Sequence, residues 1–270
     1  MADNFLEKRY AEYEARRESL QRSHRLGKKH VSRLHRFSAS IEGIDLPTEF
    51  TDPFNYTPHP LCLLATDEVM SYIDTHPEWH NELQLGKMFG VLVVKNVLGH
   101  IGFLAAFSGL LNKQNNLPYF VPAVYDMLSP NGHFKTEERE ISLLNLRIEQ
   151  LSTDGELSSL ITSMKHERKQ RSIALQTWLF EQFIIQNARG ERKNLIEIFQ
   201  EKEQHLPPGG AGECAAPKLL QYAFLNKLQP IAMAEFWWGN SPKNEERIHG
   251  HFYPACEQKC RPILNFMLNC

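Results

Sequence analysis

Three of the five cysteines stand where their thiols could act together. Cys214 follows a glycine-rich loop and precedes the apolar run Ala215–Leu225, a pattern typical of a helix start. Cys256 and Cys260 lie one helical turn apart at the start of the last helical segment, so their thiols face the same way. The dipole of a helix favours an anion at its N-terminus and so lowers the pKa of a thiol there.

Three thiolates that converge from two helix starts form a candidate zinc site, because zinc favours sulfur ligands in tetrahedral geometry. The sequence therefore predicts Cys214, Cys256 and Cys260 as metal ligands, with zinc or another metal as the cofactor. The alternative is that these cysteines are small buried residues that bind no metal. The sequence alone leaves both interpretations open.

The segments that would position these cysteines indicate an α/β fold. Two apolar, β-branched runs, Phe89–Val94 and Ile101–Phe107, flank a turn-forming segment and predict a β-hairpin. Both runs are apolar on both faces, which favours a central place in a sheet covered by helices. A helix at Ala215–Leu225, a strand at Pro230–Trp237 and the last helix follow. We expect a mixed sheet flanked by helices.

The region between the β segments has a helical pattern from Glu137 to Asn187, with a break at Thr153-Asp154-Gly155. Two helices around a break predict an antiparallel helical hairpin whose second helix reaches about Gln186. The expected organisation is a basic, flexible arm at 1–36, an α/β domain in two parts at 37–136 and 191–270, and the hairpin at 137–190.

The N-terminal arm is the candidate RNA contact. It holds ten lysines and arginines against five acids, and such cations release counterions from phosphates. The alternative is that the arm is a solvated terminus that binds no RNA. The candidate RNA-binding residues are Arg22, Arg25, Lys28, Lys29, Arg33 and Arg36.

The bulk composition excludes some classes. The 270 residues carry a net charge of −2, so any RNA contact must come from a local basic patch. Hydrophobic residues make up 42% of the chain, enough to fold most of it. No apolar run is long enough to cross a membrane, and the N-terminus lacks the apolar core of a signal peptide. We expect a cytoplasmic protein with no membrane partner.

The order hairpin, helix, strand and helix resembles the cytidine-deaminase superfamily. There, the first helix opens with a His or Cys ligand and a Glu two residues later, and the second opens with Pro-Cys-x-x-Cys. Cys214 matches the first ligand, and Pro254-Ala255-Cys256 with Cys260 resembles the second motif. The resemblance implies a deaminase-like fold around a zinc ion.

Two departures separate this chain from that pattern. Ala216 stands where the proton-shuttling Glu is expected, and the spacing from Cys256 to Cys260 is one residue longer than in the motif. Glu213 and Glu235 are possible substitutes for the Glu. Glu213 lies about 100° or more away from the expected helix face.

A second resemblance covers about Ile44–Leu268. The tail GECAAPKLLQYAFLNKLQPIAMAEFWWGNSPKNEERIHGHFYPACEQKCRPIL looks like a segment found in a bacterial subgroup of RluA-type pseudouridine synthases, as do LPTEFTDPFNYTPHPL, GKMFGVLVV and FLAAFSG. In such proteins these segments form a region ahead of the catalytic domain, and the resemblance implies a coiled-coil insertion where this chain has Glu137–Asn187. The family's chemistry needs the Asp of an Arg-Leu-Asp motif, and the nearest string here is Arg33-Leu34-His35.

The resemblance implies an accessory module for RNA modification. It carries over no catalytic residue and predicts that this chain forms no pseudouridine by itself. The module would either be part of a longer synthase or act beside a separate synthase catalytic domain, and its RNA partner would be a structured RNA, either rRNA or tRNA. Two alternatives remain: a zinc-dependent hydrolase of deaminase fold, and a structural module that binds a protein.

Overall fold

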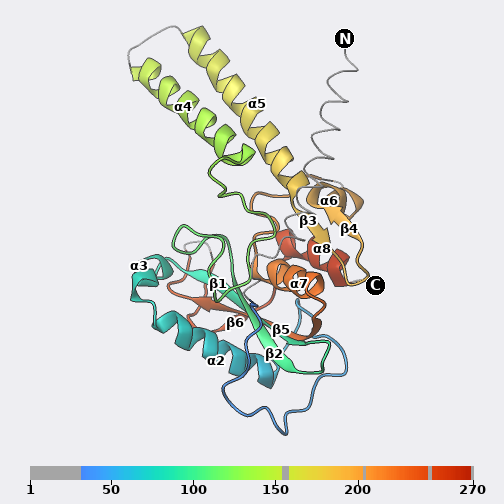
Figure 1. Ribbon diagram of the computed structural model, residues 1–270. Helices are drawn as coiled ribbons and strands as arrows, with labels where there is room; N and C mark the ends of the chain where they lie inside the picture. The colour runs from blue at the N-terminus through green and yellow to red at the C-terminus, as the bar shows by residue number, and fades with distance from the viewer. Residues whose placement is uncertain (1–31, 154–157, 203–204, 243–244, 269–270) are drawn as a thin grey trace. The chain divides into compact units, whose positions relative to one another are not determined.

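The computed structural model describes residues 32–153, 158–202, 205–242 and 245–268. The chain divides between Ser32 and Arg33, and the helices and strands described here belong to the unit that begins at Arg33. This unit combines helices with an antiparallel sheet (Figure 1). No described helix has the length and apolar character needed to span a bilayer.

Four strands form the main sheet in the order β2-β1-β5-β6. They are β1 (Lys87–Lys95), β2 (Ile101–Phe107), β5 (Gln229–Trp238) and β6 (Phe252–Tyr253). β1 and β2 form the expected hairpin, and β5 pairs with the other edge of β1.

The prediction of a mixed sheet was wrong, because every pairing among the described strands of this sheet is antiparallel. β5 runs in the same direction as β2 but does not pair with it, since β1 lies between them. The pairing of β1 with β5 shifts register between Val93 and Val94, where Pro230 lies opposite. Proline has no backbone N–H to donate, which explains the irregularity there.

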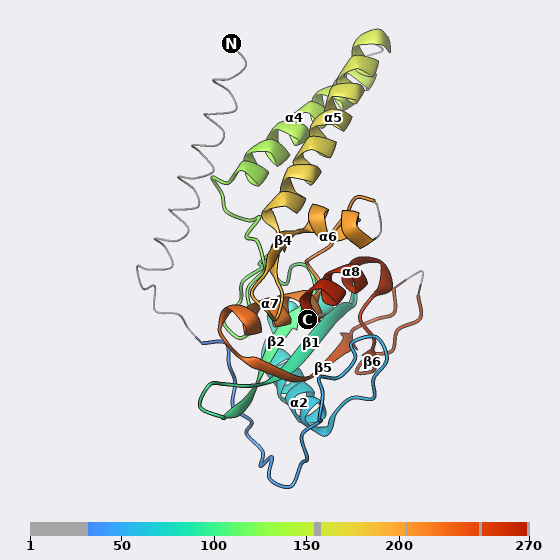
Figure 2. The same cartoon turned by 90° about the vertical axis from the view of Figure 1, so that its right-hand side faces the viewer.

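Side chains alternate between the two faces of the sheet, so each strand contributes to two cores. On β1, Leu92 and Val94 pack in one cluster, whereas Val91 and Val93 pack in the other. Helix α2 (Pro60–Asp74) packs on the second of these faces. Helices α7 (Ala215–Leu225) and α8 (Glu257–Leu268) pack on the first face, and Figure 2 shows the sheet between these layers.

Gly90 lets α7 approach the sheet closely. A Cβ built at this position would lie 3.1 Å from the Cβ of Ala215 and 3.1 Å from Cδ1 of Leu219. Both neighbours belong to α7 and are buried, so there is little room for either to move. The first turn of α7 is therefore pressed against the middle of β1.

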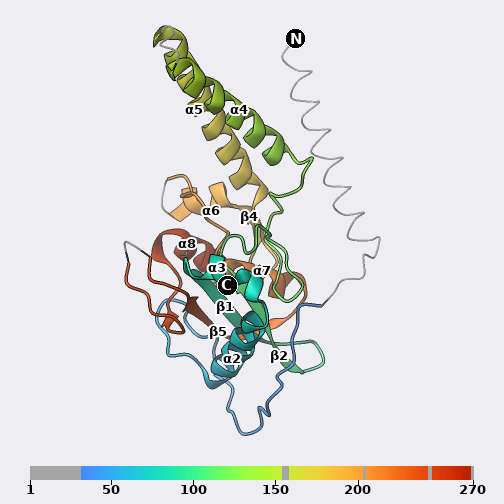
Figure 3. The same ribbon diagram turned by 90° about the vertical axis from the view of Figure 1, so that its left-hand side faces the viewer.

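The helical hairpin consists of α4 (His133–Thr153) and α5 (Ser158–Gln182), which lie side by side in Figures 1 and 3. Arg171 of α5 forms an ion pair of 3.1 Å with Glu137 of α4. Ile148 and Met164 are buried along the pair. The two helices are held by this ion pair, by a hydrogen bond of 3.1 Å from Arg168 of α5 to Oδ1 of Asn145 of α4, and by an apolar seam.

The second helix of the hairpin ends earlier than the sequence predicted. α5 stops at Gln182, and the residues beyond it form β3 (Ile184–Gln186), which pairs with β4 (Arg192–Asn194). The turn between them is fixed by Asn187, whose Oδ1 accepts the N–H groups of residues 189 and 191. Such a side-chain turn, next to two β-branched residues, favours a hairpin over another helical turn.

Three short helices complete the described structure: a 3-10 turn at Pro77–Trp79, α3 (His80–Leu83) and α6 (Leu195–Lys202). Helix α2 begins at Pro60, since proline suits the first position of a helix. The cap residue His59 accepts the N–H of Leu61 through Nδ1.

Candidate metal centre

The thiols of Cys214, Cys256 and Cys260 converge. Their Sγ atoms all lie within 4.8 Å of one another, and those of Cys256 and Cys260 are 3.4 Å apart. Two sulfurs on one tetrahedral zinc ion are about 3.8 Å apart, because each zinc–sulfur bond is about 2.3 Å long. The three cysteines can therefore hold a metal ion with small side-chain adjustments.

Two helix starts bring these residues together. Cys214 is the N-cap residue of α7, with an extended backbone, and Cys256 directly precedes α8. Cys260 lies one turn into α8, and its N–H bonds the carbonyl of Cys256 at 3.2 Å. Cys260 is buried, Cys214 is half-buried and Cys256 is exposed. The cluster is thus open on the side of Cys256 and closed on the side of Cys260.

The thiols also shift one another's pKa values. Hydrogen bonds from Cys214 and Cys260, followed by backbone N–H groups of α8, hold the pKa of Cys256 well below its usual range. The same contact with Cys256 raises the pKa of Cys214, and contacts with both other thiols raise the pKa of Cys260. The exposed thiol of Cys256 is therefore the most easily deprotonated of the three.

The loop before α7 is tied down on both sides. Gly212 has a φ of +83°, and a Cβ there would lie 2.7 Å from Cδ1 of Phe183. The next carbonyl, that of Glu213, accepts the N–H of Gly109 from the end of β2 at 3.0 Å. The position of Cys214 is therefore set by the sheet and by the core, and not only by its own helix.

Lys218 is buried one turn after Cys214. Its Nζ donates to the carbonyls of Phe107 at 2.9 Å and Gly109 at 3.1 Å, and burial lowers its pKa to about 8. The ammonium thus joins α7 to the end of β2. A lysine inside the apolar run AAPKLLQ was the signal that the sequence interpretation passed over.

Glu235 is the other buried charged residue of this region. It lies on β5, 3% of it is exposed, and its Oε1 accepts the N–H of Ala216 at 3.2 Å. Burial raises its pKa to about 8, and the thiol of Cys256 adds to that effect. The structure therefore places the Glu235 carboxyl against the residue where the deaminase pattern has its Glu. Glu213, the other named substitute, is half-buried ahead of Cys214.

Tyr56 fixes the backbone of Glu235 and was not singled out in the sequence. Its hydroxyl accepts the N–H of Glu235 at 2.8 Å and donates to the carbonyl of Tyr253 at 2.9 Å. The two residues are 179 positions apart, so no local pattern could have connected them.

The candidate RNA-binding residues are only partly described. Arg22, Arg25, Lys28 and Lys29 lie outside the described residues. Arg33 is half-buried, its side chain donates to Oδ1 of Asn116 at 2.9 Å, and burial lowers its pKa. Arg36 is exposed, next to His35, which pairs with β2. Arg33 and Arg36 therefore belong to the folded unit.

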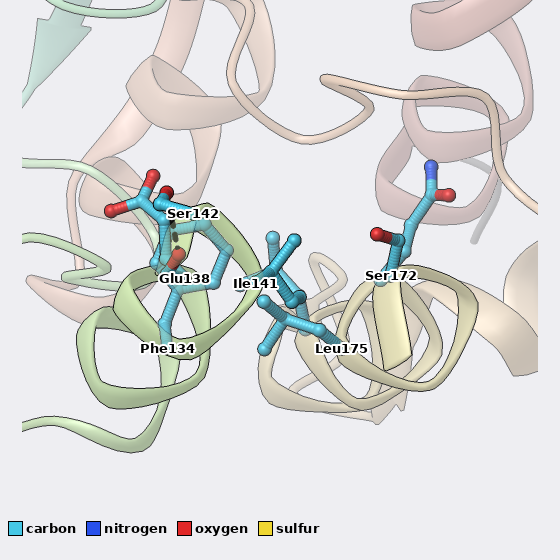
Figure 4. Close-up of a pocket in the computed structure, with 8 residues that line it drawn as sticks. Phe134, Glu138, Ile141, Ser142, Ser172 and Leu175 are labelled. Atoms are coloured by element: carbon cyan, nitrogen blue, oxygen red, sulfur yellow. Dashed lines mark hydrogen bonds between the residues drawn. The ribbon is translucent and has the colours of Figure 1, made fainter. Parts of the chain in front are cut away.

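A hollow between α4 and α5 is a second concave feature (Figure 4). Its apolar lining residues are Phe134, Ile141, Leu175 and Leu179. Among its polar residues, Glu138 is paired with Lys135 at 2.6 Å, and the Ser142 hydroxyl donates to the carbonyl of Glu138. These polar groups serve the helix itself, so the hollow offers no evident chemistry.

No protein-family model, no curated protein and no solved structure matches this chain. The assignment of a function therefore depends on the residues and their geometry.

Proposed function

We propose that this chain is a zinc-binding module whose ion is held by Cys214, Cys256 and Cys260. The observation that carries the proposal is the convergence of three sulfur atoms within 4.8 Å from two helix starts. Sulfur is the ligand atom that zinc favours, and three protein ligands leave a fourth position for water or another molecule. That pattern is typical of catalytic rather than structural zinc sites.

The fold proposed around this centre is cytidine-deaminase-like, with the α4–α5 hairpin as a coiled-coil insertion. The succession α7, β5 and α8, with a cysteine at the start of each helix, supports it. The β1–β2 hairpin precedes this succession, as the resemblance implies. Ala216 in place of the Glu argues against ordinary deaminase chemistry.

Metal analysis tests the zinc proposal. The purified protein is expected to hold about one zinc per chain, and Cys256→Ala is expected to lower its zinc affinity at least about 100-fold, since an outer-shell change alone typically costs 10- to 100-fold. Cys62→Ala is the matched control, because Cys62 is a buried thiol of α2 in the other core cluster. Equal zinc content in the two variants would refute the site.

A second proposal is that the module is accessory to RNA modification. The tail that resembles the RluA-type subgroup supplies all three cysteines of the centre, so the resemblance and the site coincide in sequence. A titration with structured RNA at two salt concentrations tests this, because phosphate contacts weaken steeply with salt. Absence of binding at low salt would leave the zinc module without this role.

The same proposal expects no pseudouridine formation by this chain, which has no Arg-Leu-Asp. Tritium release from labelled uridine in RNA measures this activity directly. Release above background would contradict the accessory role and would require another carboxylate for the chemistry.

A further inference from the structure

The three sulfur atoms of the candidate centre differ in how easily a reagent in water can reach them. Cys256 is exposed, Cys214 is half-buried, and Cys260 is buried with 1% of its surface exposed. Oxidation of a cysteine depends on access to its sulfur, so Cys256 is the first of the three to meet a dissolved oxidant. The thiol that lies closest to Cys256 then decides what the oxidised sulfur becomes.

That closest thiol belongs to Cys260. The Sγ atoms of Cys256 and Cys260 are 3.4 Å apart, and a disulfide bond of about 2.05 Å requires them to approach by about 1.4 Å. Positions four apart at a helix start are separated by about 6 Å, which lies within the usual Cα separation of a disulfide. Cys256 precedes the first residue of α8, so side-chain rotation and a small backbone adjustment at Cys256 suffice.

Cys214 is less suited to bond with Cys256. It is the N-cap residue of α7, so a bond from it to Cys256 would pull the starts of two helices together. Ala215 and Ile263, behind these two starts, are fully buried in the same cluster. A close-packed core resists such a shift, whereas Cys260 lies one turn into the helix that Cys256 precedes and needs none.

We propose that Cys256 and Cys260 form a disulfide when the protein meets a hydroperoxide, and that this disulfide releases the metal ion. The sulfur of Cys256 attacks the peroxide, the O–O bond breaks, and Cys256 becomes a sulfenic acid while the peroxide leaves as an alcohol, or as water from hydrogen peroxide. The thiol of Cys260 then attacks that sulfur. The S–S bond forms, the S–OH bond breaks, and the hydroxyl leaves as water.

The electrons and protons of this reaction balance. The two sulfurs lose two electrons, and the peroxide takes up both. In the metal-free protein the two thiols supply the two protons found in the alcohol and the water. In the loaded centre the sulfurs enter as thiolates, and both protons come from the solvent.

The disulfide removes two of the three metal ligands, because the thiolate is the form of cysteine that binds a metal. Cys214 alone then remains, and zinc in proteins is held by three or four side chains. The release of the ion rests on the proposed zinc site and adds a mode of regulation to it. The disulfide itself needs no metal, so the two parts can be tested separately.

Hydrogen peroxide tests both parts on the whole chain, with zinc bound and after a chelator has removed it. Trypsin cuts after Lys259, so a disulfide joins the peptides of Cys256 and Cys260 until dithiothreitol separates them. Fragment spectra distinguish Cys260 from Cys270 on the same peptide, and Cys214 lies on another. We expect the link between Cys256 and Cys260 in both states, and one zinc ion released for each link in the loaded protein.

Three variants test the role of each thiol. Cys256→Ser changes an exposed residue and should abolish the linked peptides. Cys260→Ala, checked for folding by circular dichroism, should leave Cys256 to oxidise to sulfinic acid, which dithiothreitol does not reverse. Cys62→Ala is the matched control in the other core cluster, and it should change neither the link nor the release of zinc.

Four results overturn the inference. Cys256 could be linked to Cys214 instead of Cys260, it could reach sulfinic acid in the wild type without any link, or it could fail to react. A link that forms while zinc stays bound would overturn the release. If the wild type binds no zinc but the metal-free protein forms the link, the zinc proposal fails and the disulfide stands.

Discussion

The two faces of the sheet bury similar apolar side chains but treat polar groups differently. On the α2 face, Phe89 contacts the rings of Phe107, Phe120 and Phe236, and the one thiol there, Cys62, is fully buried. On the other face, thiols, a carboxyl and an ammonium gather around the first turns of α7 and α8.

The difference arises from the helix ends. α2 lies along its face of the sheet and packs its apolar side chains into that core, which is rich in aromatic rings. α7 and α8 point their N-termini at one spot, and free N–H groups and a helix dipole favour anions there. Polar residues are stable in the core under α7 and α8, because the helix starts and the neighbouring carbonyls supply partners for them.

The largest expected contrast is in thiol reactivity. In the metal-free protein Cys256 is exposed and its pKa is held low, so it should react with iodoacetamide even at pH 6. Cys62 is inaccessible, and burial raises its pKa to about 12. It should react at least about 10³-fold more slowly, because it must wait for the fold to open. Mass spectrometry of timed samples gives both rates, and comparable rates would contradict the comparison.

The next largest effect is expected on the α2 face of the sheet. Phe89→Ala should destabilise the protein by about 3–5 kcal/mol, because it leaves a cavity among rings that have little freedom to move. Denaturant unfolding monitored by circular dichroism measures the loss. Zinc affinity of the folded variant should remain unchanged, since Phe89 points away from the thiols. A loss of zinc without loss of stability would show that the two faces are coupled.

Glu235, on the face of the sheet covered by α7 and α8, should make the free energy of unfolding depend on pH. Its pKa is about 8 in the fold and about 4.5 when unfolded, so the folded state holds the proton more tightly. A raised pKa contributes stability that is fully present below about pH 4.5 and is lost as the pH rises through about 8. The metal-free protein should therefore lose a few kcal/mol over this range. Glu235→Gln should flatten that decline, and an unchanged slope of unfolding free energy against pH would contradict it.

Much of this fold could be predicted because the decisive signals are local. The bounds of α7 agree with the sequence prediction, and so does the β1–β2 hairpin. Both depend on apolar periodicity and turn residues within a few positions. The end of α5 could not be placed, because a side-chain turn at Asn187 competed with helix propensity in the same stretch.

The convergence of the three thiols was predictable, but the groups around them were not. Two helix starts with cysteines were enough to expect the three thiols together. The position of the Glu235 carboxyl depends on which face of β5 it occupies and on contact with Ala216, and both follow from a register that the sequence does not contain. Lys218 needed the same knowledge, because its partners are carbonyls more than a hundred residues away.

A smaller effect is expected at the loop that presents Cys214. Gly212→Ala places a Cβ at a positive φ and against the ring of Phe183. We expect a loss of about 1–3 kcal/mol in unfolding free energy. Because the added Cβ should displace the loop and with it the start of α7, the affinity of the proposed site for zinc should fall as well. Thermal unfolding with and without added zinc separates the two losses, and an intact zinc affinity would show that Cys214 is held by α7 alone.

The smallest effect is expected at Glu213, and it tests the contrast between this residue and Glu235. Glu213 and Glu235 are both carboxylic acids near Cys214, yet the first is half-buried and the second is fully buried. Since Glu213 retains contact with water, Glu213→Gln should change the unfolding free energy by less than about 0.5 kcal/mol. The decline of stability with pH should also persist in this variant, because Glu235 remains. If the decline of unfolding free energy with pH were flattened in Glu213→Gln, the buried Glu235 would not be the residue that causes it.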